Sequence, residues 1–150
     1  MRKTFLLLIL LYGHLYALER ESTLKMYHKL FFTLSPKAIV SVYVNDNEYR
    51  KIFSASKRIR LSKEPANADV VLITNLVTLK KVLRQEKNMQ TDKKPMLFTT
   101  DYRFLERSDD IIGAFYWRKG RSQLLFIKNR LDEHHITLPK EYEDFLVDEL

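Results

Sequence analysis

The chain contains no cysteine, which excludes disulfide bonds, thiolate zinc sites, iron–sulfur clusters and cysteine nucleophiles. Glycine is also scarce, with 3 among 150 residues, at positions 13, 113 and 120. So few glycines exclude both the Gly-rich loop of dinucleotide-binding folds and the phosphate-binding P-loop. Hydrophobic residues nevertheless make up 45% of the chain, a composition that predicts one globular domain.

Residue patterns typical of catalytic and metal sites are weak as well. His134 and His135 are adjacent, so their side chains point in different directions, unlike the i, i+4 pair of a zinc-binding helix. Asp109 and Asp110 could act as an acid and base, but neighbouring acidic residues ahead of a strand more often form a turn. No Gly-x-Ser-x-Gly elbow occurs. We therefore expect a protein that is not an enzyme and has no metal and no cofactor.

The amino terminus has the features of a secretory signal peptide. Arg2 and Lys3 precede an unbroken apolar run of eight residues at 5–12, and 15–17 (Leu-Tyr-Ala) provides a cleavage site. We expect residues 1–17 to be removed, which leaves one domain at 18–150. An uncleaved membrane anchor is the alternative, because Leu15 is larger than the residue usual at that position. The run is, however, far shorter than the roughly 20 apolar residues of a spanning helix.

The chain is basic, and this charge limits the classes of partner. The formal net charge of +7 falls to +5 when Arg2 and Lys3 are removed. Export argues against a nucleic-acid partner, so the excess charge suits solubility, a small anionic ligand, an anionic membrane surface or an acidic protein face. The simplest interpretation is a solvated surface, because the basic pairs are scattered along the chain.

Hydrophobic periodicity predicts an alternation of helices and strands. An amphipathic helix is expected at 24–34, capped by Ser22 and Thr23 and ended by Pro36. Further helices are expected at 48–54, 76–83, 129–134 and 140–150, with a helical turn through 104–105. Strands are expected at 38–44, 58–61, 68–74, 96–100, 111–117 and 122–127, with 58–61 at an edge. The last two strands flank Gly120 and predict a hairpin.

Strands separated by helices predict an α/β fold with a mainly parallel sheet, helices on both faces and an antiparallel hairpin near the carboxyl terminus. In such three-layer domains, ligands bind beyond the carboxyl ends of the strands. Asn75, Thr99, Thr100 and Asp101 are therefore the candidate ligand-binding residues. The competing interpretation is that these side chains cap helices and form turns, together with Asn45, Asp46 and Thr74 at the other strand ends.

The hairpin tip is the candidate surface for partner binding. Tyr116, Trp117, Arg118 and Arg121 lie there, and Tyr, Trp and Arg are the residue types that dominate protein interfaces. Strand alternation allows one of the two aromatic side chains to face inward. The alternative is therefore that Tyr116 and Trp117 have a purely structural role and that the basic residues only solvate the turn.

The element order and several local sequences together resemble the YfiR-like family of small periplasmic proteins. The matching segments are 24–31, 68–73, 95–101 with Phe104, 111–113, 120–121, 126–127 with Asn129, and 136–139. The resemblance covers most of residues 18–150. The chain departs from the family in lacking the cysteines that some members carry, and in having Ser35 where a tryptophan before proline is common.

This resemblance implies a single periplasmic domain akin to one lobe of a solute-binding protein. It also implies a partner, since family members are associated with regulating inner-membrane diguanylate cyclases or sensor kinases. A small solute-binding component of a transporter is the alternative function. Removal of 17 of the 150 residues leaves 133, enough for one lobe, whereas a transport receptor normally closes two lobes around its ligand. The regulatory function is therefore favoured.

Overall fold

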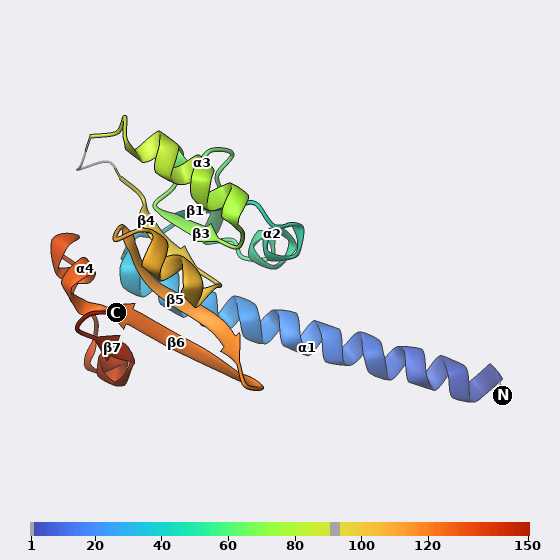
Figure 1. Ribbon diagram of the computed structural model, residues 1–150. Coiled ribbons are helices and arrows are strands. Elements are labelled where there is room, and N and C mark those ends of the chain that lie inside the picture. Colours follow the sequence, from blue (N-terminus) through green and yellow to red (C-terminus); the bar gives the residue numbers. More distant parts are fainter. Residues whose placement is uncertain (1, 91–93) are drawn as a thin grey trace.

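The computed structural model describes residues 2–90 and 94–150, apart from the side chains of residues 2–16 and 18. Within these residues the fold is α/β, built on a seven-stranded sheet of order β2-β1-β3-β4-β5-β6-β7 (Figure 1). The strands are β1 (Val40–Val44), β2 (Ile59–Leu61), β3 (Val70–Ile73), β4 (Met96–Thr99), β5 (Ile111–Arg118), β6 (Arg121–Ile127) and β7 (Leu146–Val147). β2, β1, β3, β4 and β5 are parallel neighbours, β5 and β6 form the antiparallel hairpin, and β7 pairs in parallel with β6.

The helices connect these strands and flank the sheet. The α-helices are α1 (Arg2–Leu34), α2 (Asn47–Ser54), α3 (Leu76–Glu86) and α4 (Lys128–Glu133). The short 3-10 helices are η1 (Pro65–Asn67), η3 (Tyr102–Arg107) and η4 (Lys140–Phe145). Within the described residues no helix has the length and apolarity needed to cross a membrane.

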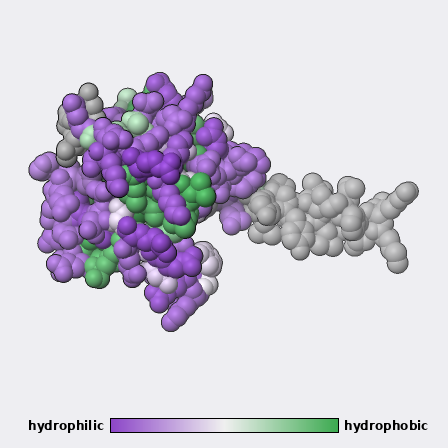
Figure 2. All heavy atoms as spheres, turned by 45° about the horizontal axis from the view of Figure 1, so that its top comes forward, coloured by the Kyte–Doolittle hydropathy of each residue, from purple (hydrophilic) through white to green (hydrophobic). Residues whose placement is uncertain are grey.

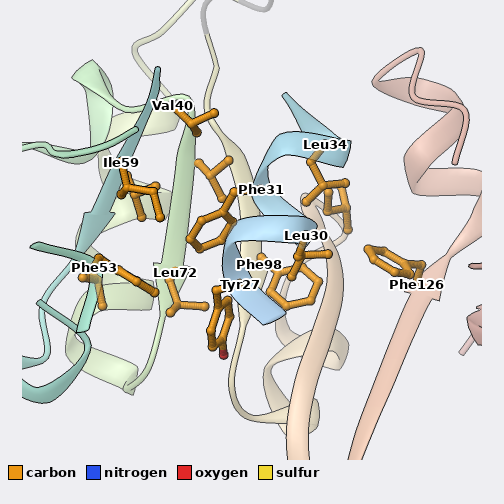
Figure 3. Close-up of a cluster of buried hydrophobic side chains, with 14 of the residues drawn as sticks. Tyr27, Leu30, Phe31, Leu34, Val40, Phe53, Ile59, Leu72, Phe98 and Phe126 are labelled. Carbon is orange, nitrogen blue, oxygen red and sulfur yellow. The ribbon is translucent and has the colours of Figure 1, made fainter. Parts of the chain in front are cut away.

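Two hydrophobic clusters cover the two faces of the sheet. On one face, Tyr27 and Phe31 of α1 and Phe53 of α2 pack on β1, β3 and β4. Figure 3 shows the α1 side chains between Phe53 on one side and Phe126 of β6 on the other. On the opposite face, Leu79 of α3 belongs to a second cluster with residues of β3, β4 and η3. The central strands are thus buried on both sides, as expected of a parallel sheet.

Most of the predicted elements are confirmed, but the two ends of the chain differ from expectation. Ser22 and Thr23 do not cap α1, because the helix runs through them without a break from Arg2. At the carboxyl terminus the predicted helix at 140–150 is wrong. Lys140–Phe145 forms a 3-10 helix, and Leu146 and Val147 then pair with Phe126 and Ile127. Tertiary pairing therefore overrides local helix propensity here.

An irregularity at the start of β5 determines which way the hairpin side chains face. Leu97 of β4 pairs with Ile111 whereas the next residue, Phe98, pairs with Gly113, so one extra residue is inserted in β5. After this bulge Phe115 faces the cluster on the α1 side, and Tyr116 faces the opposite cluster. Trp117 follows Phe115 by two positions and therefore lies on the α1 side.

A buried arginine fixes the loop between η3 and β5. The Arg130 guanidinium donates hydrogen bonds to the backbone oxygens of Leu105, Ser108 and Ile111 at 2.9 to 3.0 Å. It also pairs with the exposed carboxylate of Asp109 at 3.1 Å. Its side chain is only 8% exposed, so these partners replace its lost hydration.

Glu86 makes stability depend on pH. Burial raises the pKa of this carboxyl from 4.5 to about 7, with a smaller contribution from Asp110, while Lys94 opposes the rise. As the pH increases from 4.5 to about 7, the unfolded chain loses this proton before the folded protein does, so the stability contributed by Glu86 falls across that interval.

The neutral variant Glu86→Gln should therefore gain stability relative to the natural protein as the pH rises through this interval. Urea denaturation of both proteins at a series of pH values measures the difference. Parallel stability curves would contradict this prediction.

Candidate interaction surface at the carboxyl edge of the sheet

The parallel topology brings both groups of predicted site residues to one edge of the sheet. β1, β3, β4 and β5 all point the same way, so the residues that follow them gather at a common carboxyl edge. The chain leaves β1 for β2 on one side and returns to β3 on the other, which makes this edge a topological switch point. β5 and β6 extend beyond it, because Ala114 is paired with the last residue of β4, Thr99.

The polar side chains at this edge form helix caps. Asp46 accepts hydrogen bonds from the backbone N–H groups of Glu48 and Tyr49 at the start of α2. Asn75 accepts one from the backbone N–H of Thr78 at the start of α3. The structure thus places Asp46 and Asn75 in the capping role that was the competing interpretation.

Thr99, Thr100 and Asp101 also make contacts within the fold. The buried Thr99 hydroxyl donates to the backbone oxygen of Ile73 at 2.9 Å, and the Thr100 backbone N–H donates to the same oxygen at 3.1 Å. Asp101 caps η3 and pairs with Arg103, whose guanidinium holds the pKa of this carboxyl below its usual value. A small ligand at Asn75, Thr99 and Asp101 would have to displace these internal partners.

Exposed hydrophobic side chains lie beside these occupied polar groups. Leu76 and Val77 in the first turn of α3 are 37% and 72% exposed, and Tyr102 at the start of η3 is 39% exposed. We call these three residues the edge patch. Figure 2 turns the α3 side of the molecule forward and shows a largely hydrophilic face with hydrophobic atoms near its centre.

The hairpin is joined to the edge patch through Tyr102. The Tyr116 ring lies 5.0 Å from the Tyr102 ring, measured between centroids, and the Arg118 guanidinium carbon lies 5.3 Å from the Tyr102 centroid. Tyr116 is consequently half-buried. Trp117 on the opposite face of the hairpin is 73% exposed, so it is not the inward-facing aromatic residue.

The hairpin turn concentrates positive charge. Arg118 and Arg121 are directly opposite in the β5–β6 ladder, and Lys119 and Gly120 form the turn between them with φ values of 50° and 74°. Two positive φ values in a two-residue turn match the twist of the strands. Arg118, Lys119 and Arg121, with Gln123, line an open hollow of about 360 Å³.

Of the predicted hairpin residues, Trp117, Arg118 and Arg121 are exposed and Tyr116 is half-buried, and the edge patch adds Leu76, Val77 and Tyr102, which were not among the predicted site residues. A signal for Val77 was present, because it is an apolar residue that falls outside the helical spacing of Leu79, Val82 and Leu83. In the described part of the chain, no group of three or more histidine or acidic side chains is placed to hold a metal ion.

Comparison with known proteins supports the fold alone. No protein-family profile and no curated protein matches the chain. A solved structure of a conserved domain protein from Vibrio cholerae O1 biovar El Tor is similar, with a TM-score of 0.59 and 14% identity. The match covers 83% of this chain and 59% of that protein, so the chain spans less than two thirds of its length. At this level of identity the similarity concerns the α/β architecture alone.

Proposed function

We propose that this protein is an exported, non-catalytic regulator that binds the periplasmic part of an inner-membrane signalling protein, either a cyclase or a sensor kinase. In this proposal residues 1–17 are the signal peptide and residues 18–150 act in the periplasm. The partner contacts the edge patch together with the hairpin residues Tyr116, Trp117, Arg118 and Arg121. The resemblance of the sequence to YfiR-like proteins supports this class of partner.

One observation carries the proposal, namely that apolar and aromatic side chains are exposed at the carboxyl edge while the side chains of Asp46, Asn75, Thr99 and Asp101 are bonded internally. Val77 and Trp117 are each more than 70% exposed. Large exposed apolar side chains are typical of protein interaction sites, and Tyr, Trp and Arg are the usual anchors of such sites; here Val77 lies on the α3 side of the edge and Trp117 on the α1 side of the hairpin. An occupied set of polar caps does not favour the alternative of a solute-binding component.

The variant Val77→Glu tests this surface. A buried charge in the interface should weaken capture of the partner at least about tenfold, which corresponds to roughly 1.4 kcal/mol. Folding should be unaffected, because a glutamate in the first turn of a helix interacts favourably with the helix dipole. The measurement is binding, without lipid, to the isolated periplasmic domain of a membrane cyclase or sensor kinase, sought among the genes that neighbour this one.

Ile39→Glu provides the matched control. Ile39 is 43% exposed and precedes β1, so it lies at the opposite, amino edge of the sheet. Its variant should bind the periplasmic domain normally. Equal capture by the Val77 variant and the natural protein would remove the edge patch from the interface, and failure of the natural protein to bind would contradict the proposed function.

A further inference from the structure

The end of the β5–β6 hairpin is a convex projection whose two faces have different chemistry. Trp117 and its cross-strand partner Ser122 are on the α1 side of the hairpin, whereas Arg118 and Arg121 form a pair on the other side. Lys119 is in the turn between them. Contact with both faces at once requires a ligand that surrounds the tip.

Two basic residues of the tip repel each other across the hairpin. Like charges directly across an antiparallel pair are destabilising, and Arg118 faces Arg121 in this way. Among the salt bridges between described residues, none involves Arg118, Lys119 or Arg121. Arg118 contacts the Tyr102 ring, but neither this contact nor the ion pairs of the described residues neutralise the positive charge of the tip, which an external anion would do.

The hairpin tip projects on the side of the protein where α1 enters the fold. α1 precedes β1 and packs against β5 through Tyr27 and Phe115, whose ring centroids are 5.8 Å apart. Figure 1 shows the amino-terminal part of α1 and the hairpin tip leaving the body of the protein on the same side.

We propose that this hairpin tip docks on the surface of a lipid bilayer that contains anionic headgroups. Trp117 enters the headgroup layer, where tryptophan is enriched in membrane proteins, and Arg118, Lys119 and Arg121 contact lipid phosphates. A headgroup layer surrounds an inserted tip and offers apolar and anionic groups to its two faces at once. The inference goes beyond the proposed function and rests on it only in placing the protein at the inner membrane.

The protein carries its own probe for this contact, because Trp117 is its single tryptophan. Fluorescence emission can therefore be recorded from protein recovered from exporting cells while vesicles are added. Vesicles of phosphatidylcholine with phosphatidylglycerol should shift the emission to shorter wavelength, since the exposed indole would leave water. Vesicles of phosphatidylcholine alone and inorganic phosphate at the same anion concentration should not produce the shift.

Two double variants, each of which removes two positive charges, test whether the charges of the tip in particular bind the vesicles. The double variant Arg118→Gln with Arg121→Gln should weaken vesicle binding about 30-fold, because each basic residue near an anionic surface contributes about fivefold. Lys80 and Arg84 are exposed on α3 and have the same total charge, so replacing both by Gln should leave binding unchanged. High salt should weaken the contact of the natural protein.

Three results would overturn this inference. The first is an emission shift that is as large with neutral vesicles, and the second is equal loss of binding in the two double variants. The third is an absent shift while the protein sediments with vesicles, which would assign binding to another segment. If the tip does not bind lipid but the edge patch still binds the isolated periplasmic domain of the partner, the membrane contact is wrong and the proposed function stands.

Discussion

Replacement of Arg130 by methionine is expected to lower the free energy of unfolding by about 3 to 5 kcal/mol, because it removes the guanidinium donor from three backbone carbonyl groups, of which those of Leu105 and Ile111 are buried. Methionine retains much of the apolar volume of the arginine side chain, so the loss would come mainly from the missing hydrogen bonds. Urea denaturation followed by far-ultraviolet circular dichroism measures it.

Asp109→Asn separates the carbonyl contacts from the ion pair. The Asp109 side chain is 98% exposed, so its pairing with Arg130 should contribute no more than about 1 kcal/mol. If the Asp109 variant lost as much stability as the Arg130 variant, charge pairing rather than carbonyl binding would explain the role of Arg130.

Gly113→Ala is expected to lower the free energy of unfolding by about 1 to 3 kcal/mol through overpacking. A Cβ atom at this position would lie 2.5 Å from the backbone oxygen of Leu125 and 2.9 Å from ring carbons of Phe98 and Phe126. The backbone oxygen cannot move without disturbing the β5–β6 ladder, in which Gly113 is paired with Phe126. The same denaturation experiment measures this effect.

Gly120→Ala is the contrasting variant at the hairpin turn. Nothing lies within 4 Å of the added Cβ there, but φ is 74°, which gives alanine a strain of about 1 to 2 kcal/mol. Strain at an exposed turn should leave the core unchanged, so the Gly120 variant should keep the natural near-ultraviolet spectrum. Gly113→Ala should alter it through the displaced Phe98 and Phe126 rings, and an unaltered spectrum with full stability would contradict the overpacking argument.

The sequence predicted the central strands because each is a short, mainly apolar run with a helix-capping residue two positions after its end. Val40–Val44, Val70–Ile73 and Met96–Thr99 all lie inside their predicted ranges. The bulge beside Gly113 was not predictable in this way, since it arises from the register between β4 and β5. β7 was missed for a similar reason: two residues are too few to show periodicity, and they become a strand through pairing with β6.

The candidate surface was predicted in part. The parallel topology predicted which residues lie at the ends of the strands. Which of their side chains remain free depends on hydrogen bonds in the folded protein, and these cannot be read from the sequence. Asn75 and Asp101 are bonded in caps, while Trp117 is exposed. The alternation of side chains along a strand showed that Tyr116 and Trp117 face opposite sides of the sheet, but it did not show which of them faces inward. The extra residue in β5 determines this, because it reverses the side to which every later side chain of the strand points.

The order of the strands has a consequence for how the chain folds. Apart from β1 and β2, which are exchanged, the strands occur in the sheet in the order in which they occur along the chain. Each new strand can therefore join an edge that its predecessors have already formed, and short loops are closed at each step. The contacts between η4 and α1 are an exception to these short loops. Glu141 hydrogen-bonds to Lys29 and Tyr142 hydrogen-bonds to Thr33, and each pair is separated by more than 100 residues. Docking of the carboxyl terminus on the first helix should accordingly be a late event, after the sheet has formed.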